Sequence, residues 1–229
     1  AKGIDFQLVG KVADYLRKNN VGDTVTYVVN RNINFTNVCI KQCGFCAFSR
    51  DFREEEGYTL PIDEITRRAK EAYTYGATEV CVQAGLPPDM DAGLYENICR
   101  EIKIEVPDIH IHGFSPEEIL YGANRSKVST KEYLSRLKDA GVDTIPGTAA
   151  EILNQKLRDK ISPGRITVEE WTDVIKTAHK MGIKSTSTMM FGHLETNEHR
   201  VNHIDTIREI QKETGGFTEF VPLNFIHTE

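Results

Sequence analysis

The sequence predicts an α/β fold, a partial (β/α)6 barrel in which six parallel strands alternate with helices. Three observations lead to this prediction. Short extended segments alternate with helical ones, the strands are polar on only one face, and the 229 residues fall short of the roughly 250 that a complete eight-stranded barrel needs. We expect a single domain over residues 1–229, because no repeat, low-complexity tract or linker interrupts the alternation.

The elements follow from local patterns along the chain. Extended segments are expected at 24–34, 79–84, 108–114, 142–146, 184–190 and 218–224. Helices, in which apolar residues recur at about 3.6 positions, are expected at 63–75, 92–106, 130–140, 168–181 and 197–214. Gly76, Gly141 and Gly182 follow three of these helices as candidate C-terminal caps. Strands that alternate with helices pair in parallel through right-handed crossovers.

The faces of the strands favour a barrel over an open, doubly wound sheet. Side chains alternate along a strand, so Ile109 and Ile111 share one face of the third segment. His110 and His112 share the other face. An open sheet covered on both sides would be apolar on both faces. Strands that are apolar outward and polar inward fit a barrel with helices outside and a lumen that holds a ligand.

Composition narrows the class of protein. Hydrophobic residues make up 39% and charged residues 27% of the chain, which is ordinary for a folded protein and excludes disorder, collagen and coiled coil. The net charge of −6 argues against broad electrostatic binding to nucleic acid or anionic membranes. No apolar run approaches the roughly 20 residues that span a bilayer, and no signal peptide is visible, so we expect a cytoplasmic protein.

The chemistry is expected at a cluster of cysteines. Cys39, Cys43 and Cys46 lie in the run VCIKQCGFCAF, whereas Cys81 and Cys99 stand alone and are expected in the core. Three soft sulfur ligands from one loop select zinc or an iron–sulfur cluster. A structural zinc site needs four ligands, and the chain has no second CxxC. Three cysteines on a four-iron cluster leave one iron open, as a catalytic metal centre requires.

This motif resembles that of a known superfamily. The spacing CxxxCxxC after the first strand, with Phe45 before the last cysteine, resembles the radical S-adenosylmethionine (SAM) superfamily. Longer runs resemble the family of the tyrosine-using subunit of FO synthase, from about Val21 onward: TYVVNRNINFTNVCIKQCGFCAFSRDFREEEGY, VQAGLPPDMD, IHIHGFSPEEILYGA, PGTAAEIL, SPGRIT and GGFTEFVPLNFIH. Members of that family have further residues at the C-terminus, so we expect this chain to be truncated there.

The resemblance implies a fold, an activity and two cofactors. It implies the TIM-type partial barrel of the radical SAM enzymes, with a 4Fe–4S cluster held by Cys39, Cys43 and Cys46 and SAM bound to the open iron. An electron from the cluster cleaves SAM, and the resulting 5′-deoxyadenosyl radical takes hydrogen from L-tyrosine. The 4-hydroxybenzyl fragment then joins 5-amino-6-(D-ribitylamino)uracil, in the biosynthesis of FO and coenzyme F-420. The implied partners are the FO-forming radical SAM enzyme and an unidentified electron donor.

The resemblance also assigns residues to SAM. Gln83 and Gly85 end the second strand where the superfamily places a glycine-containing loop against the methionine moiety; a plain strand-ending turn is the alternative. Glu151, which ends PGTAAE, resembles the carboxylate that contacts the ribose, and the alternative is an acidic residue in the first turn of a helix. Arg165 in SPGR suits the methionyl carboxylate, and the alternative is an exposed loop arginine.

A further loop resembles the adenine-contacting loop of the superfamily. It is the run FGHLE at 191–195, in which backbone groups, including those of Gly192 and His193, are expected to make the contacts. Phe45 is expected to help, with simple loop packing as its alternative.

Substrate contacts are expected from polar side chains of the lumen. His110 and His112 are the best candidates, because two imidazoles project into a space that apolar side chains would otherwise fill. Structural histidines with satisfied hydrogen bonds are the alternative. Asn32, Asn34 and Ser115 are further candidates.

Three other functions stay open. Aminofutalosine synthase of menaquinone biosynthesis shares the cluster loop and a similar HxH strand, although the run NRNINFTNVCIKQCGFCAFSRDF argues for the tyrosine enzyme. A noncatalytic iron–sulfur or zinc protein would need a fourth protein ligand. His199 and His203 lie four apart on an expected helix, but an ordinary polar helix face is the better interpretation. The third is a truncated, inactive piece of the enzyme.

Overall fold

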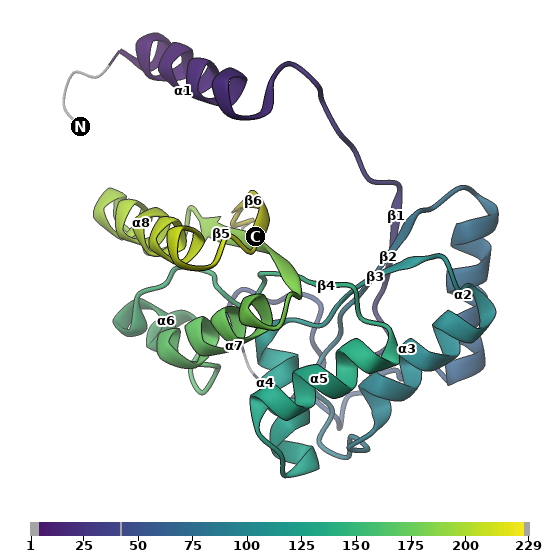
Figure 1. Ribbon diagram of the computed structural model, residues 1–229. Coiled ribbons are helices and arrows are strands. Elements are labelled where there is room, and N and C mark those ends of the chain that lie inside the picture. Colours follow the sequence, from purple (N-terminus) through teal and green to yellow (C-terminus); the bar gives the residue numbers. More distant parts are fainter. Residues whose placement is uncertain (1–4, 42, 227–229) are drawn as a thin grey trace.

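In the computed structural model, residues 5–41 and 43–226 are described. Their strands form one sheet in the order β1-β2-β3-β4-β5-β6, and each strand pairs in parallel with the next. The sheet curls into a half-barrel with helices around its outer side (Figure 1). The strands are β1 Asn30–Ile33, β2 Glu79–Val82, β3 His110–Gly113, β4 Thr144–Ile145, β5 Lys184–Phe191 and β6 Phe217–Asn224. The predicted partial barrel is confirmed.

The helices agree with the sequence in part. They are α1 Phe6–Val21, α2 Ile62–Thr74, α3 Leu94–Glu105, α4 Pro116–Ser126, α5 Thr130–Ala140, α6 Gln155–Ile161, α7 Val168–Lys180 and α8 Asn197–Thr214. The predicted bounds of α5 and α8 are confirmed, and those of α2, α3 and α7 differ by one or two residues. The sequence does not predict α1, α4 or α6. Gly141 caps α5 as predicted, while Gly76 and Gly182 stand one residue beyond the caps of α2 and α7.

The start of α4 brings two acidic residues to the end of β3. Ser115 accepts a hydrogen bond from the N–H of Glu118, and the Glu118 carboxylate accepts one from the N–H of Ser115. Pro116 stands at the first helical position, where its missing N–H costs nothing. Because α4 begins so soon after β3, Glu117 and Glu118 lie at the carboxyl end of the sheet.

The core lies between the outward face of the sheet and the helices. Val80 of β2 pairs with Ile111 of β3, and both side chains are fully buried. On the opposite face Cys81 pairs with His112, which in turn pairs with Thr144 of β4. This register confirms that the strands are apolar outward and polar toward the lumen.

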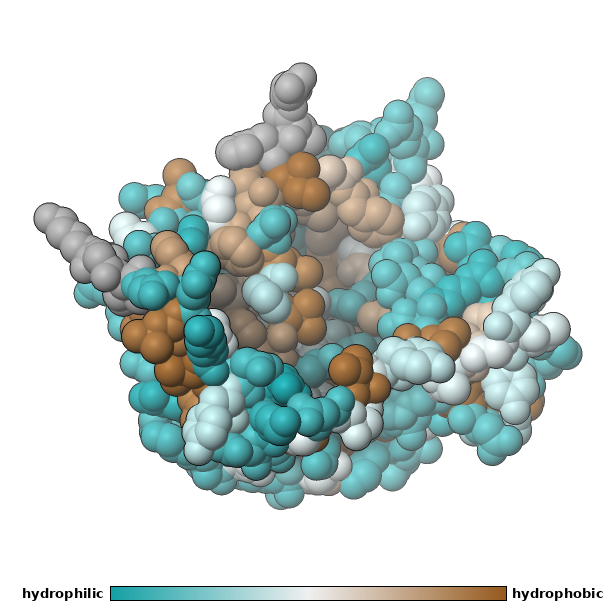
Figure 2. Space-filling view, turned by 90° about the horizontal axis from the view of Figure 1, so that it is seen from above, coloured by the Kyte–Doolittle hydropathy of each residue, from teal (hydrophilic) through white to brown (hydrophobic). Residues whose placement is uncertain are grey.

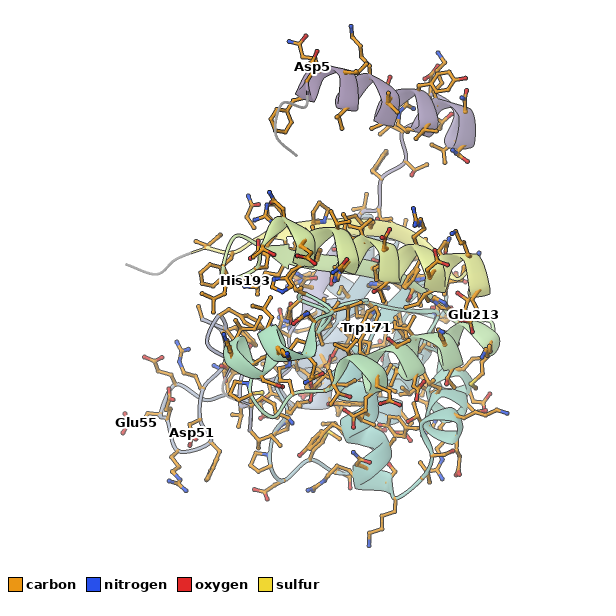
Figure 3. All side chains as sticks on the ribbon, turned by 90° about the vertical axis from the view of Figure 1, so that its left-hand side faces the viewer. Asp5, Asp51, Glu55, Trp171, His193 and Glu213 are labelled. Atoms are coloured by element: carbon orange, nitrogen blue, oxygen red, sulfur yellow. The ribbon has the colours of Figure 1, made fainter. Side chains whose placement is uncertain are left out.

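The first helix, α1, stands clear of the half-barrel at the end of an extended segment (Figure 1, Figure 3). None of its residues is buried. Large apolar side chains are exposed on α1 and on β6, for example Phe6, Leu16, Phe220 and Leu223. Figure 2 shows apolar side chains gathered around a hollow on the face seen from above. Within 5–41 and 43–226, no helix is long and apolar enough to cross a membrane.

Candidate active site

The three motif cysteines lie in residues 36–50, which we call the cysteine loop. Backbone hydrogen bonds fasten this loop to two neighbouring elements. The N–H of Ile40 donates to the carbonyl of Leu86, after β2, at 2.9 Å. The N–H of Gly44 donates to the carbonyl of Ile161, at the end of α6, also at 2.9 Å. The loop therefore lies at the carboxyl ends of the strands, where barrels of this kind carry their active sites.

The motif cysteines share one cavity. Cys39, Cys43 and Cys46 are half-buried free thiols, and all three line a cavity of about 130 Å³. The wall also contains four of the other predicted site residues: Phe45, Gly85, Ser115 and Arg165. Burial raises the pKa of the Cys43 thiol to about 11, although the nearby guanidinium of Arg165 acts to lower it.

Gly85 touches the cysteine loop directly. Its N–H donates to the carbonyl of Thr36 at 2.9 Å. A Cβ at this position would lie 2.3 Å from the carbonyl oxygen of Val38 and 3.1 Å from the Cβ of Cys39. Only glycine permits this approach. Gly85 thus has a structural task that the sequence did not predict, in addition to the predicted contact with the methionine moiety.

Gln83 and Asn34 connect the ends of two strands and a loop, and neither lines the cysteine cavity. The amide nitrogen of Gln83 donates to the sulfur of Cys81 at 3.1 Å, and its amide oxygen accepts from the hydroxyl of Thr148 at 2.7 Å. The Asn34 amide donates to the backbone carbonyl of Gln83 at 3.0 Å. These bonds join the ends of β1 and β2 to the loop after β4.

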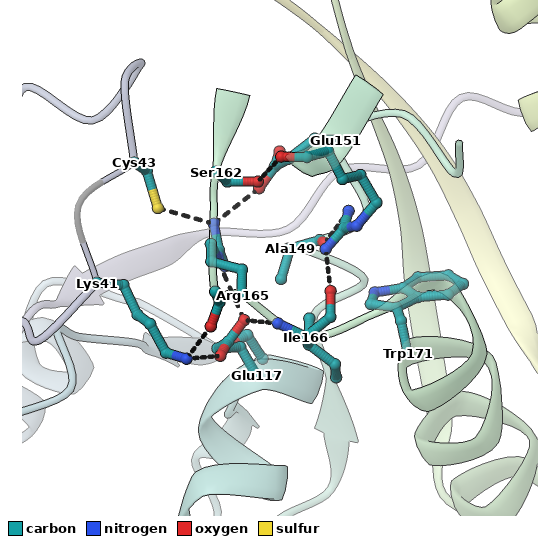
Figure 4. Close-up of polar contacts among 12 residues, drawn as sticks. Lys41, Cys43, Glu117, Ala149, Glu151, Ser162, Arg165, Ile166 and Trp171 are labelled. Carbon is teal, nitrogen blue, oxygen red and sulfur yellow. Dashed lines mark hydrogen bonds and ion pairs between the residues drawn. The ribbon is translucent and has the colours of Figure 1, made fainter. Parts of the chain in front are cut away.

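A network of buried charges lies beside Cys43 (Figure 4). Nη1 of Arg165 is 3.1 Å from Oε1 of Glu151 and 3.6 Å from the sulfur of Cys43, while its Nε is 3.1 Å from Oε2 of Glu117. Nζ of Lys41, from the cysteine loop, is 3.5 Å from the other oxygen of Glu117. Burial lowers the pKa of Arg165, but Glu151, Cys43 and Glu117 outweigh it, so the net shift is upward.

The alternatives offered for these two residues are wrong. The side chain of Arg165 is only 13% exposed, so it is not an exposed loop arginine. Glu151 is not in the first turn of a helix, because α6 begins at Gln155. The backbone of Glu151 has a φ of 45°, in the left-handed region that residues other than glycine rarely adopt.

The loop after β5 borders a second cavity of about 270 Å³. Its lining includes Phe45, Met190, His193 and Leu194, so Phe45 lies in the walls of both cavities. Gly192 does not line either of them.

Two backbone N–H groups of this loop already have a partner. Those of Gly192 and His193 donate to the carboxylate of Glu195, at 2.7 and 2.9 Å. Burial raises the pKa of Glu195, but these bonds and Arg200 lower it to about 2. Backbone contacts of this loop with an adenine would therefore come from groups other than these two.

The lumen histidines meet at one hydroxyl. Nε2 of His110 and Nδ1 of His112 each lie 2.7 Å from Oγ1 of Thr144. Burial, and then the neighbouring His110, lower the pKa of His112 to about 4. Asn32, on β1 in the same register row as His112, is exposed, whereas Ser115 is buried in the wall of the cysteine cavity.

Comparison with known proteins decides the family. Residues 33–207 match the model of the radical SAM superfamily. The chain belongs to the radical SAM superfamily. The fold agrees, since the crystal structure of methylornithine synthase (PylB) superposes with a TM-score of 0.75 at 17% identity, over 97% of this chain and 60% of that one. The [FeFe]-hydrogenase maturase HydG superposes with a TM-score of 0.72 at 16% identity, over 100% of this chain and 50% of that one.

Curated relatives are much closer in sequence. The chain is 50% identical to the 5-amino-6-(D-ribitylamino)uracil–L-tyrosine 4-hydroxyphenyl transferase of Methanothermobacter thermautotrophicus, over 98% of this chain and 61% of that protein. It is also 50% identical to the FO synthase of Nocardia farcinica, over 99% of this chain and 26% of that protein. The chain thus spans about three-fifths of the first relative and about a quarter of the second.

The residues of the cysteine cavity fit the cofactors of this superfamily, a 4Fe–4S cluster and SAM. Thiolates are the usual ligands of such clusters, and three thiols face one cavity here. No three His, Cys, Asp or Glu side chains in the described ranges converge as ligands of a single metal ion. His203, considered as a zinc ligand, is buried and bonded through both ring nitrogens, to Leu153 N–H and the Thr188 carbonyl.

The sequence did not point to three residues in the wall of the cysteine cavity, Lys41, Glu117 and Glu118, or to the buried Arg158. The run SPEE after a strand signals a capping box, which would have shown that Glu118 turns inward. Glu118 also accepts from the N–H of Ala84 at 2.8 Å, and burial raises its pKa to about 7. No local pattern marks Arg158, because only tertiary packing buries it.

Proposed function

We propose that this chain is the radical SAM core of a 5-amino-6-(D-ribitylamino)uracil–L-tyrosine 4-hydroxyphenyl transferase. It joins the 4-hydroxybenzyl group of L-tyrosine to 5-amino-6-(D-ribitylamino)uracil, in the biosynthesis of FO and coenzyme F-420. The observation that carries the proposal is 50% identity to a transferase of that name over 98% of this chain, a span that includes the whole candidate site. The main hydrophobic cluster, which draws its residues from Ile33 to Phe217, supports a single domain.

The cysteine cavity is the cofactor site in this proposal. Cys39, Cys43 and Cys46 hold the cluster, which with bound SAM supplies the radical that removes hydrogen from tyrosine. Arg165 binds the methionyl carboxylate, for which a planar guanidinium is suited, and Glu151 accepts hydrogen bonds from the ribose. In this structure the two side chains bond each other at 3.1 Å, so SAM replaces that ion pair with its own contacts. The other residues proposed for SAM are Phe45, Gln83, Gly85, Gly192 and His193, the last two through groups other than their backbone N–H groups, which bind Glu195.

The lumen is the substrate site in this proposal. The Thr144 hydroxyl has one proton, so it donates to one imidazole and accepts from the other. Oε2 of Glu79 lies 3.7 Å from Nε2 of His110 and favours a proton on that nitrogen. The Thr144 hydroxyl then donates to Nδ1 of His112, so the neutral His112 ring carries its proton on Nε2. That Nε2–H can donate a hydrogen bond to a substrate oxygen. Asn32, Asn34 and Ser115 are the other proposed substrate contacts.

The proposal extends to partners. An FO-forming radical SAM enzyme consumes the product, an electron donor reduces the cluster, and both meet this chain in the cytoplasm. The FO synthase of Nocardia, of which this chain matches 26%, supports the first partner, since the remaining length leaves room for a second catalytic unit.

Product analysis tests the transferase directly. The chain is reconstituted with iron and sulfide without oxygen, reduced, and given SAM, tyrosine and 5-amino-6-(D-ribitylamino)uracil. Mass spectrometry should find 5′-deoxyadenosine together with a 4-hydroxybenzyl adduct of the uracil. If 5′-deoxyadenosine formed without an adduct, the radical chemistry would stand, but the substrate assignment or the completeness of the chain would fail. The substrates of aminofutalosine synthase would then be assayed next.

A further inference from the structure

Arg158 of α6 is a buried cation that binds only backbone carbonyls among the described residues. Its side chain is almost completely buried, at 1% exposure. Nη1 donates to the carbonyls of Ala149 and Ala150 at 2.9 and 2.6 Å, and Nη2 donates to the carbonyl of Ile166 at 2.6 Å. Its Nε has no hydrogen-bond partner in the described ranges. Burying a charged side chain costs free energy, which the three charge-assisted hydrogen bonds of Arg158 offset. A buried arginine that binds three backbone carbonyls indicates a specific structural role for Arg158.

The first two carbonyls belong to the turn that presents Glu151. Ala149 has a φ of 64° and Glu151 a φ of 45°, so two of three consecutive residues are in the left-handed region. Neither is a glycine, and such a backbone persists only where its surroundings hold it. The bonds from Arg158 to Ala149 and Ala150 supply that support, next to the carboxylate proposed for the ribose.

The third carbonyl belongs to the neighbour of Arg165. The peptide groups of Ile166 are bonded by two buried charges: Glu117 accepts its N–H at 2.7 Å, and Arg158 donates to its C=O. Glu117 also accepts from Arg165 at 3.1 Å, as Figure 4 shows. The segment that carries Arg165 is thus held between α4 and α6.

We propose that Arg158 is a positioning residue for SAM: through Ala149, Ala150 and Ile166 it sets the places of Glu151 and Arg165. It does not touch the ligand itself. The inference rests on the proposed function, since it requires that this cavity binds SAM. Arg158 holds both the turn that carries Glu151 and the segment that carries Arg165. A substitution of Arg158 should therefore disturb the contacts proposed for the ribose and for the methionyl carboxylate of SAM together.

Affinity measurements on reconstituted variants test this. Arg158→Met should weaken SAM binding by about tenfold or more, the range seen when a supporting residue behind a site is lost, while iron content stays that of the wild type. Arg158→Lys should recover part of the affinity, because an ammonium group can donate to some of the three carbonyls. The change that SAM causes in the electron paramagnetic resonance spectrum of the reduced cluster should weaken in parallel. Arg136→Met is the matched control, because Arg136 is an exposed arginine whose ion pair within the described residues is with Glu132, on the same helix α5.

Three results would overturn the inference. One is a folded Arg158→Met protein with a lower melting temperature but the SAM affinity of the wild type, which is the signature of a purely structural arginine. If Arg158→Met does not fold, Arg158→Lys decides alone, and unchanged affinity in that variant counts against the proposal. If the wild type itself does not bind SAM, the proposed function fails together with the inference. If the wild type binds SAM and only the substrates prove wrong, the role of Arg158 stands.

Discussion

The buried imidazole ring of His203 makes the free energy of unfolding depend on pH. Its Nδ1 accepts from the N–H of Leu153 and its Nε2 donates to the carbonyl of Thr188, both at 3.0 Å, so the ring is neutral. Burial lowers its pKa to about 4, against about 6.5 in an unfolded chain. Only the unfolded state takes up the proton between these values. The stabilisation is therefore present above pH 6.5 and is lost as the pH falls toward 4.

We expect this residue to contribute about 2 kcal/mol to the loss of unfolding free energy between pH 7 and pH 5. Urea unfolding of the wild type and of His203→Asn at both pH values measures it. The variant keeps an acceptor for Leu153 but has no group at position 203 that titrates in this range. It should be less stable at pH 7 and should lose about 2 kcal/mol less on acidification. An equal loss of unfolding free energy in both proteins would show that His203 is not the titrating group. The pKa values of His112 and His179 are also lowered to about 4, but both histidines are present in the two proteins, so their effect cancels in the comparison.

At the scale of elements, the contact between the loop after β2 and the cysteine loop sets the shape of the site. Gly85→Ala would place a methyl group 2.3 Å from the carbonyl oxygen of Val38, and backbone cannot rotate away as a side chain can. We expect a loss of about 1–3 kcal/mol in unfolding free energy, the usual effect of overpacking, and weaker retention of iron. Urea unfolding and iron analysis measure the two effects.

Gly10→Ala is the control for this substitution. Gly10 lies inside α1, and apart from its chain neighbours and the backbone of α1 itself no atom of the described residues comes within 4 Å of the added methyl group. Alanine also favours a helix over glycine. Its iron content and unfolding midpoint should not fall. If Gly85→Ala behaved like Gly10→Ala, the close approach of the two loops would not exist in solution.

The elements also show what the sequence can predict. The five helices with strong apolar periodicity and all six strands were predicted, because their patterns are local. The strand expected from residue 24 begins only at Asn30, since apolar residues such as Val25 and Tyr27 are β-formers without a pairing partner among the described strands. The motif cysteines, Gly85 and Arg165 were predicted to lie together from resemblance. The support from Glu117 and Arg158 was not. Glu117 meets Arg165 from 48 residues away, and Arg158 reaches its three carbonyls across turns that no local pattern predicts.

At the scale of the whole molecule, α1 is separate from the half-barrel. No residue of α1 is buried, and the first backbone bond to the sheet is accepted by the carbonyl of Val29. We expect deletion of residues 1–27 to change the unfolding free energy by less than about 0.5 kcal/mol, as for other changes away from the core. A denaturation curve measures it. A loss of more than about 2 kcal/mol would instead mean that the exposed apolar face of α1 packs on the half-barrel in solution.

Iron analysis combined with electron paramagnetic resonance tests the central claim most directly, namely that Cys39, Cys43 and Cys46 hold a 4Fe–4S cluster to which SAM binds. The reconstituted chain should contain about four irons and, once reduced, give a signal that changes when SAM is added. Cys43→Ser should lose the iron and the signal but stay folded, while Cys99→Ala, at a fully buried core cysteine, should keep both. A Cys43→Ser protein with full iron, or a wild-type signal that SAM leaves unchanged, would contradict the account.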